Sequence, residues 1–482
     1  MLEIIQDKLK GYKFIVVSNR QPYAHTRKGN EIQCNKTVSG LTIALDPVMQ
    51  AVGGVWIAWA SGDADMDVVD ENNCVKVPPQ KPSYTLKRVV LSKKEVDGFY
   101  YGYANQALWP LSHIVYEKPV FLKEHWECYK EINKRFAQNI IDEIGDEKAF
   151  IWLQDYHFTL AAKYIKERKP DATVALFWHI PWPNPEAFRI CPQKTDILEG
   201  LLSCDLLGFH IRYHCSNFLE TVDSELEARV SREECNVVYH GHKTLIKDFP
   251  ISVDFGGLSE QAKSKEVEIR IQKLSEEIPP PFEILAIGVD RIDYTKGILE
   301  RLHAVDRFLE KYPQYHKKFV FYQAGALSRI HIPAYKELND KVEESVEKIN
   351  WKYREGNWYP IVVTNKILSY AEHLALYRRA DLCLVSSLHD GMNLVAKEFV
   401  SANVEGKGVL VLSQFTGAAR ELSKGAVLIN PYDFDSTSDA IKEAIEMPSQ
   451  EKKERMQTLR EIVAENDIYK WVERFISYTD KL

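Results

Sequence analysis

Arg291, Lys296 and Gly297 stand close together in the segment Asp-Arg-Ile-Asp-Tyr-Thr-Lys-Gly at residues 290–297. The segment follows the apolar run Ile284 to Gly288 and precedes an amphipathic stretch, which predicts a turn from a strand into a helix. The free amides and the dipole at a helix N-terminus favour an anion, so two cations beside them could stabilise a departing diphosphate without a metal. The spacing alone equally allows a salt bridge to Asp293 at the helix start.

A second segment with polar chemistry, Asp-Gly-Met-Asn-Leu-Val-Ala-Lys-Glu at residues 390–398, follows the apolar run Leu382 to Val385. Asp390 could bind a sugar hydroxyl and Glu398 a ribose diol, as acidic residues do in nucleotide sites. The backbone amides of Asn393, Leu394 and Val395 would be unsatisfied donors of a first helical turn. The alternative is that Asp390 and Asn393 cap the helix and Glu398 is exposed to solvent.

A second anion site could form from two arginines, Arg20 and Arg329, together with Tyr100 and Trp109. Arginine forks suit phosphate, and aromatic faces suit the C–H surfaces of a sugar. The aromatic stretch at residues 99–110 is equally typical of a core segment, and a single arginine is usually solvated. The sequence alone leaves open whether these residues meet.

Other chemistries find little support in the sequence. His210 and His214 have helical spacing but lack the glutamate of a zinc protease motif, so no metal site is predicted. The phosphate-binding loops of dehydrogenases and P-loop enzymes and the nucleophile elbow of hydrolases are also missing. A two-carboxylate hydrolase that uses Asp155 and Asp390 stays open, although nothing in the spacing demands it.

Short apolar runs alternate with longer amphipathic stretches along the chain, which predicts an α/β protein with two doubly wound parallel sheets. The strands are expected at Phe14–Ser18, Phe150–Leu153, Thr173–Trp178, Asp205–Phe209, Ile284–Gly288, Phe319–Gln323, Ile361–Thr364, Leu382–Val385 and Val409–Leu412, and helices at Tyr129–Ile144, Gly297–Lys311, Ala334–Lys348 and Asn393–Ala402. The polar segments follow the carboxyl ends of these strands, where open α/β sheets bind ligands. Phe249-Pro250 is the preferred domain boundary over the prolines at 279–281, and a helix at Ser259–Glu276 would open the second domain.

Length and composition limit the classes of function that the protein could have. The chain has 482 residues with 62 Lys and Arg against 69 Asp and Glu, a formal charge of -7 that argues against nucleic acid or an anionic membrane as main partner. The eight cysteines are scattered without a CxxC pair, which is typical of a reduced cytoplasmic protein. The charged N-terminus is unlike a signal peptide, and no run approaches about 18 apolar residues, so no membrane span is predicted.

Three stretches in order carry a family resemblance, namely residues 290–297, DGMNLVAKEFV at 390–400 and SQFTGAA at 413–419. They resemble the retaining glycosyltransferases of the trehalose-6-phosphate synthase family, and the match runs from about Phe14 to near the C-terminus. The resemblance implies the GT-B architecture, in which two Rossmann-like doubly wound domains face a central cleft. Residues 1–251 would then bind the acceptor and residues 252–482 the nucleotide sugar, with the last helix crossing back to the first domain.

The family pattern also implies roles for individual residues. It assigns acceptor contacts to Arg20, Tyr100, Trp109, Asp155 and Arg329. It assigns donor contacts to Ser39, Gly40, His179, Arg291, Lys296, Leu368, Asp390, Asn393, Leu394, Val395 and Glu398. Arg291 and Lys296 would act in catalysis by holding the diphosphate, and no metal or other cofactor is expected in this family.

Several positions depart from the family pattern. Ser39-Gly40 stands where the family has Gly-Gly, and His389 stands where it has Arg. The Arg20-Gln21-Pro22-Tyr23 run resembles the glucosylglycerol-phosphate synthases, which use glycerol 3-phosphate, whereas Ser328-Arg329 follows the trehalose-6-phosphate synthases. The acceptor is therefore less firmly indicated than the fold.

The resemblance implies an α,α-trehalose-phosphate synthase (UDP-forming), which moves glucose from a nucleotide diphosphate glucose to glucose 6-phosphate with retention. UDP-glucose is the default donor, although the sequence does not determine the nucleotide base of the donor. The oligomeric state is also left open, and a homo-oligomer is one possibility. The alternatives are a glucosylglycerol-phosphate synthase and a non-catalytic, regulatory subunit that binds sugar phosphates.

Overall fold

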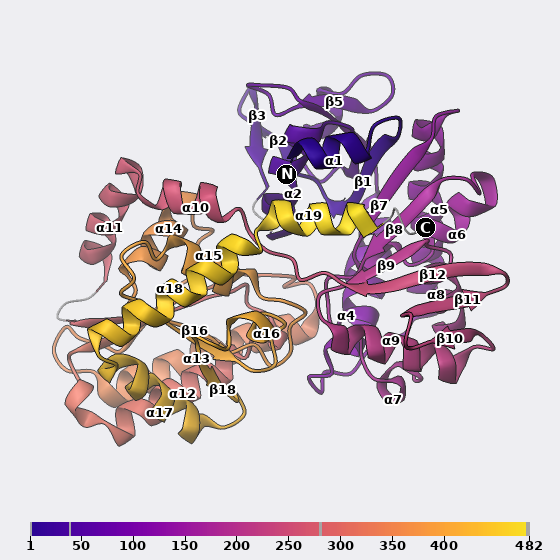
Figure 1. The fold of residues 1–482 in the computed structure, drawn as a ribbon. Coiled ribbons are helices and arrows are strands. Elements are labelled where there is room, and N and C mark those ends of the chain that lie inside the picture. The colour runs from indigo at the N-terminus through magenta and orange to yellow at the C-terminus, as the bar shows by residue number, and fades with distance from the viewer. Residues whose placement is uncertain (1, 38–39, 279–281, 479–482) are drawn as a thin grey trace. The chain divides into compact units, whose positions relative to one another are not determined.

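The computed structural model describes residues 2–37, 40–278 and 282–478. The chain divides into two compact units, of which the first comprises Met1–Ile251 and Ile468–Leu482 and the second Ser252–Asp467 (Figure 1). Each unit is built on a mainly parallel sheet with helices, so the predicted fold class is confirmed. Ser39 and the prolines at 279–281 lie outside the described residues.

The first unit contains a ten-stranded sheet. In spatial order the strands are β10 (Arg229–Ser231), β11 (Asn236–Tyr239), β12 (His242–Asp248), β9 (Leu206–Phe209), β8 (Thr173–Phe177), β7 (Ala149–Gln154), β1 (Lys13–Arg20), β4 (Val55–Trp59), β6 (Tyr84–Val89) and β5 (Cys74–Val77). From β12 to β6 all neighbours run parallel, and antiparallel strands close both edges. The central strand β7 is buried at every position because helices cover both faces of a parallel sheet.

The strands that the sequence analysis did not predict have identifiable reasons. In β6 the charged Lys87 and Arg88 are buried, which hides the apolar pattern of the strand. The antiparallel hairpin of β2 (Tyr23–Lys28) and β3 (Glu31–Lys36) is mostly polar. Such strands carry no apolar run, so the criterion that found β1 and β7 could not find them.

The helices of the first unit include one unusual segment. They are α1 (Leu2–Lys8), α2 (Gly40–Val52), α3 (Lys93–Val96), α4 (Trp109–His113), α5 (Lys123–Ile144), α6 (Ala161–Arg168), α7 (Pro185–Phe188), α8 (Lys194–Leu201), α9 (Arg212–Glu225) and α19 (Ile468–Tyr478), with short 3₁₀ turns η1 (Asp65–Asp67) and η3 (Tyr156–Phe158). The segment η2 (Asp97–Leu108) is a π-helix. Helix α5 begins before the predicted Tyr129 because its N-cap, Leu122, offers no side-chain signal.

The last helix, α19, packs into the core of the first unit. Figure 1 shows it in yellow beside α1 and α2, and all three belong to this unit. The ring of Trp471 lies 4.9 Å from that of Trp152 in β7, and the ring of Phe475 lies 4.5 Å from it. The Trp471 indole N–H donates a hydrogen bond of 3.1 Å to the carbonyl of Phe249. Helix α19 therefore covers one face of the first sheet.

The second unit contains a six-stranded, entirely parallel sheet. In spatial order the strands are β15 (Ile361–Thr364), β14 (Phe319–Ala324), β13 (Ile284–Val289), β16 (Leu382–Val385), β17 (Val409–Ser413) and β18 (Val427–Ile429). The predicted strands at 361–364 and 382–385 have the bounds expected from their apolar runs. Strands β13, β16 and β17 are neighbours, so their carboxyl ends lie side by side.

Helices surround this second sheet. They are α10 (Phe255–Ala262), α11 (Lys265–Glu277), α12 (Ile298–Lys311), α13 (Pro333–Tyr353), α14 (Tyr370–Arg379), α15 (Leu394–Ala402), α16 (Ala419–Leu422), α17 (Phe434–Glu446) and α18 (Ser449–Glu465), with 3₁₀ turns η4 (Tyr294–Lys296) and η5 (Pro313–Tyr315). The single helix expected at Ser259–Glu276 is wrong, because Ser264 accepts the N–H of Val267 and starts a new helix. In the described part of both units, no helix is long and apolar enough to cross a membrane.

Candidate functional site

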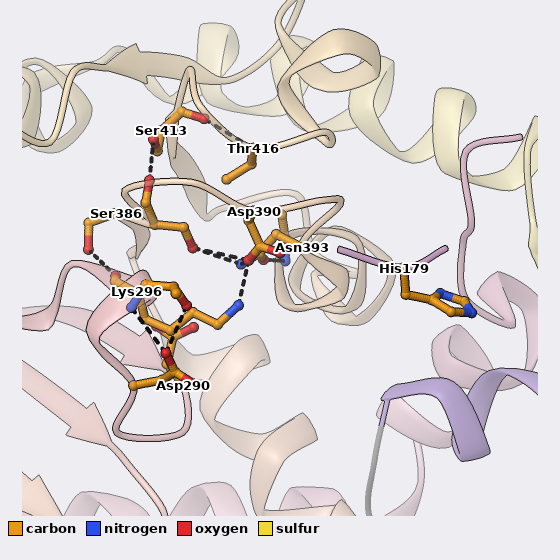
Figure 2. A network of polar contacts seen from close by, with 12 residues as sticks. His179, Asp290, Lys296, Ser386, Asp390, Asn393, Ser413 and Thr416 are labelled. Carbon is orange, nitrogen blue, oxygen red and sulfur yellow. Dashed lines mark hydrogen bonds and ion pairs between the residues drawn. The ribbon is translucent and has the colours of Figure 1, made fainter. Parts of the chain in front are cut away.

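Three loops gather at the carboxyl ends of β13, β16 and β17 in the second unit. The loop after β17 supports the loop after β16, because the Asp390 N–H donates to the carbonyl of Phe415 at 3.1 Å and the Gly417 N–H donates to the carbonyl of Asp390 at 3.1 Å. The Ser413 hydroxyl donates to the carbonyl of Ser387 at 2.7 Å (Figure 2). The motif at 413–419 therefore fixes the backbone of the motif at 390–398.

Lys296 and Asp390 form an ion pair in the centre of these loops. Figure 2 shows the Lys296 ammonium directed at the Asp390 carboxylate, and the two groups lie 2.5 Å apart. The same carboxylate oxygen accepts hydrogen bonds from the Ser387 hydroxyl at 3.2 Å and the Asn393 amide at 3.3 Å. Burial lowers the pKa of Lys296, but Asp390 and Asp290 outweigh burial and raise the pKa overall. Lys296 is therefore a charged donor at neutral pH.

Arg301 in α12 joins the ends of three strands. Its side chain is buried and donates to Asp290 at 2.6 Å, to Gln323 at 2.9 Å and to the Ser386 hydroxyl at 2.9 Å. Burial raises the pKa of Asp290 although Arg301 opposes the shift. The sequence analysis missed Arg301; an arginine on the apolar face of an amphipathic helix was the available signal.

Gly297 makes the turn from η4 into α12 possible. Its φ angle of 61° lies in the left-handed region, and a Cβ at this position would lie 2.2 Å from the carbonyl oxygen of Ser386. The Ser386 hydroxyl also donates to the carbonyl of Gly297 at 2.8 Å. Only glycine fits this close approach, which places Lys296 directly before the helix N-terminus.

The salt bridge to Asp293 that the spacing allowed is not made by Arg291 or Lys296 in the described residues. Asp293 is buried and accepts hydrogen bonds from the Thr295 N–H at 3.1 Å and the Tyr335 hydroxyl at 3.1 Å. Burial raises the pKa of Asp293, but Arg329 and Arg291 outweigh burial and lower it. Arg291 itself is exposed beside the helix start.

Arg329 belongs to the second unit, with its side chain buried. It donates to the Tyr335 hydroxyl at 2.5 Å and forms an ion pair with Asp293 at 3.4 Å. Its φ angle is 49°, which is uncommon for a residue other than glycine. Because Arg20 belongs to the first unit, the expected sharing of one anion by Arg20 and Arg329 stays a prediction.

Asn393 starts helix α15 with a φ angle of 102°. Its side-chain oxygen accepts the N–H of Ala396 at 3.0 Å. The alternative that Asn393 caps the helix is therefore confirmed. Asp390 is not the cap, since its carboxylate pairs with Lys296. Leu394 and Val395 occupy the first turn, where backbone N–H groups have no partner within the helix.

Glu398 is half-buried, so the alternative that exposes it to solvent is wrong. The Tyr377 hydroxyl in α14 donates to its carboxylate at 2.9 Å. Burial raises the pKa of Glu398 to about 7, and the hydrogen bond from Tyr377 opposes this shift. Leu368 lies half-buried in the loop between β15 and α14, directly before Ser369, which caps α14.

The first unit brings together four residues assigned to the acceptor. The Arg20 guanidinium donates to the Tyr100 hydroxyl at 3.1 Å. The ring of Tyr100 stacks on His157 with 5.9 Å between centroids, and the ring of Trp109 lies 5.8 Å from Tyr156. Tyr156 and His157 directly follow the fourth assigned residue, Asp155. Arg20, Tyr100, Trp109 and Asp155 are therefore linked through this turn.

Asp155 has a φ angle of 76° and orders the loop at the end of β7. Its carboxylate accepts the N–H of Tyr156 at 3.0 Å and the N–H of His179 at 3.1 Å. Nε2 of His179 lies 2.8 Å from the side-chain oxygen of Gln154, so the ring donates from this nitrogen. Burial, assisted by His157, lowers the pKa of His179 to about 3, which makes the ring neutral.

Two further expectations concern Gly40 and metals. Gly40 is the exposed first residue of α2, and its predicted partner in donor binding, Ser39, lies outside the described residues. Within the described ranges, no three His, Cys, Asp or Glu side chains are grouped so that they could hold a metal ion. In the loop after β13, the cations beside the start of α12 are Lys296 and the exposed Arg291.

Comparison with known proteins identifies the family. The model of glycosyltransferase family 20 matches residues 12–481. The chain is 35% identical over 474 residues to a trehalose-6-phosphate synthase of Mycolicibacterium vanbaalenii, and the match covers 97% of this chain and 95% of the relative.

Solved structures agree with this match. A trehalose-6-phosphate structure from E. coli bound with UDP-2-fluoro glucose has a TM-score of 0.85 at 30% identity, covering 97% of this chain and 99% of the other. A UDP-forming α,α-trehalose-phosphate synthase of Burkholderia xenovorans in complex with glucose-6-phosphate has a TM-score of 0.85 at 28% identity, covering 96% and 99%. With its two parallel-sheet units and their motifs, the chain therefore belongs to glycosyltransferase family 20 and is a GT-B enzyme of the trehalose-6-phosphate synthase family.

Proposed function

We propose that the protein transfers glucose from UDP-glucose to O1 of glucose 6-phosphate and forms α,α-trehalose 6-phosphate with retention. The observation that carries the proposal is the charged Lys296 held at the N-terminus of α12 beside Asp390. The relatives support the choice of substrates, because the E. coli structure is bound with UDP-2-fluoro glucose and the Burkholderia structure is in complex with glucose-6-phosphate.

The donor would be bound by the second unit. Lys296 and Arg291 would hold the diphosphate, and the free N–H groups of the first turn of α15 would contact phosphate or glucose. Asp390 would bind a glucose hydroxyl and Glu398 the ribose diol, with the base beside the backbone of Leu368. Each charge-assisted hydrogen bond contributes about 1.5 to 3 kcal/mol.

The acceptor would be bound by Arg20, Tyr100, Trp109 and Asp155 of the first unit, with Arg329 as a second cation. The guanidinium of Arg20 would meet the phosphate, while the indole of Trp109 would pack on the sugar ring. Asp155 would orient the acceptor rather than act as a nucleophile, since its carboxylate already accepts two backbone N–H groups.

In the chemical step, the bond from the donor glucose C1 to the diphosphate oxygen breaks and a bond from C1 to the acceptor O1 forms on the same face. The acceptor hydroxyl gives its proton to the departing diphosphate. Lys296 and Arg291 would stabilise the negative charge that develops on this leaving group, which is the role that a metal takes in other transferases. The neutral His179, whose Nε2–H is donated to Gln154, would accept a hydrogen bond from a hydroxyl of the donor glucose at Nδ1.

We propose that this reaction needs no metal or other cofactor and takes place in the cytoplasm. The cationic pair at the helix start supports the first point. The eight cysteines, all free thiols, support a reducing compartment.

The test is release of nucleotide diphosphate from UDP-, ADP- and GDP-glucose, each with glucose 6-phosphate or glycerol 3-phosphate, in the presence of EDTA. We expect release of UDP with glucose 6-phosphate, and a product mass that equals trehalose 6-phosphate. Release only with glycerol 3-phosphate would assign the sister activity. Folded protein that binds glucose 6-phosphate but releases no nucleotide would contradict the proposal and indicate a regulatory subunit.

A further inference from the structure

The segment η2 is a π-helix of 12 residues, whereas π-helical geometry is usually confined to a single turn. It contains Tyr100 and leads without a break into Trp109, so two acceptor residues depend on its shape. A long π-helix is intrinsically unfavourable, and contacts from outside the segment must therefore stabilise it.

Asn105 supplies such a contact. Its side chain is buried, with an exposed fraction of 1%. The side-chain N–H donates to the carbonyl of Tyr100 at 2.6 Å, five residues earlier in η2. The side-chain oxygen accepts the hydroxyl of Tyr156 at 3.0 Å. One amide group thus satisfies a partner inside the π-helix and another in the turn after β7.

Tyr156 is itself firmly held, so the contact with Asn105 has a fixed end. Tyr156 is buried, and its carbonyl accepts the hydroxyl of Tyr129 at 2.6 Å. The Tyr129 hydroxyl also lies 2.9 Å from that of Thr159. Tyr156 directly follows Asp155 and packs against Trp109, so it borders two residues of the acceptor site.

We propose that Asn105 is a positioning residue of the acceptor site. By bridging the Tyr100 carbonyl and the Tyr156 hydroxyl, it fixes the π-helix against the turn at Asp155 and so sets the affinity for the sugar phosphate acceptor. Asn105 acts through these neighbours and not by touching substrate. The inference deepens the proposed function and rests on it.

Gln106 provides a matched control within the same helix. Its side-chain N–H donates to the carbonyl of Tyr101 at 3.0 Å, which is the same spacing of five residues. Gln106 is only half-buried, and among the described residues its side chain makes no hydrogen bond outside η2. Gln106→Ala therefore removes the contact inside the π-helix without removing a bridge.

The experiment measures the KM for each substrate and kcat in four variants. In Asn105→Ala we expect the KM for glucose 6-phosphate to rise about tenfold, with the KM for UDP-glucose within about twofold of wild type. Tyr156→Phe should raise the acceptor KM about threefold, and the double variant should be no worse than Asn105→Ala, because both changes break one shared contact. Gln106→Ala should leave all three constants unchanged.

A second readout follows the segment directly. Hydrogen exchange measured by mass spectrometry should show faster exchange across residues 97–108 in Asn105→Ala but not in Gln106→Ala. If Asn105→Ala does not fold, the acceptor KM of Tyr156→Phe tests the inference instead, because this variant removes only the hydroxyl that bonds to Asn105. An unchanged acceptor KM in the folded variant would overturn the inference, as would equal effects on both substrates or an equal effect of Gln106→Ala.

The inference about Asn105 can be tested even if the proposed reaction is wrong. If wild type forms no product, calorimetric titration of glucose 6-phosphate in the presence of UDP replaces the kinetics. Binding to wild type with about tenfold weaker binding to Asn105→Ala would uphold the inference without the reaction. No binding of glucose 6-phosphate to wild type would overturn both.

Discussion

The ammonium of Lys296 lies 2.5 Å from the carboxylate of Asp390, although 94 residues separate them and they follow different strands. Both residues are assigned to the same donor, one to its diphosphate and one to its glucose. The Asp390 carboxylate supplies negative charge that offsets the burial of the Lys296 ammonium. A diphosphate bound by Lys296 would therefore share the ammonium with Asp390 or displace the carboxylate, and variants of the pair test this expectation.

Removing the donor-side cations should slow the transfer step. We expect Lys296→Ala and Arg291→Ala each to lower kcat by about 10²-fold to 10³-fold, because each removes positive charge from the departing diphosphate. Arg291 is exposed, so Arg291→Ala should unfold at the temperature of wild type. Single-turnover kinetics and thermal unfolding measure the two effects, and near-normal turnover in both variants would refute the leaving-group role.

Neutralising Asp390 should strengthen the binding of UDP while it weakens catalysis. In Asp390→Asn, Lys296 loses the carboxylate that neutralises it, so its charge is fully available to the diphosphate. We expect the Kd for UDP to fall about threefold to tenfold, and kcat to fall because a glucose contact is lost. Calorimetric titration with UDP checks the first result. Weaker binding of UDP would show that Asp390 is needed to position Lys296.

Gly297→Ala should destabilise the protein more than a change at a comparable glycine. Gly356 has nearly the same φ, 62° against 61°, but a Cβ there would meet nothing within 4 Å. Gly356→Ala should cost roughly 1 kcal/mol of unfolding free energy from the left-handed backbone alone. Gly297→Ala should cost at least about 1 kcal/mol more from the clash with Ser386. Chemical denaturation measures the difference, and equal costs would contradict the close approach.

Glu398 should make donor binding dependent on pH. Its pKa of about 7 means that the carboxylate, which accepts hydrogen bonds from a ribose diol, becomes protonated as the pH falls below neutrality. We expect the KM for UDP-glucose to rise toward about tenfold per pH unit below pH 7. Glu398→Gln should have a raised KM that is independent of pH in this range. The same slope in wild type and variant would assign the titration to another group.

The ionisation of Glu398 also makes the stability of the folded protein depend on pH. Because the folded pKa of Glu398 is raised from 4.5 to about 7, its contribution to stability is fully present below pH 4.5 and is lost as the pH rises through 7. Glu398→Gln should remove this part of the pH dependence. Denaturation curves between pH 5 and about pH 8 provide the control for the kinetic experiment.

The sequence allowed prediction of those features that depend on neighbouring residues. Buried parallel strands are continuous apolar runs, so β7 and β16 could be located directly. Polar residues at their carboxyl ends, such as Asp155 and Asp390, could then be assigned to one edge of each sheet. The contact of Arg20 with Tyr100 was left open, and the structure shows it.

Contacts between distant segments could not be predicted in this way. Arg301 bonds to Gln323 and Ser386, and which of these partners a buried arginine selects depends on the packing of the whole sheet. The π-helical form of η2 also depends on contacts from outside, since Asn105 and Tyr156 are 51 residues apart. Local propensity carries no information on such pairs.

The return of α19 to the first unit has a consequence for synthesis of the chain. Trp471 and Phe475 cover the face of the first sheet that contains Trp152, yet they leave the ribosome only after the entire second unit. The second unit, continuous from Ser252 to Asp467, has all its residues before the first unit has its last helix. The nascent protein must therefore keep an uncovered tryptophan face from aggregating until α19 has been synthesised, so the first unit finishes folding only after the second unit has been made.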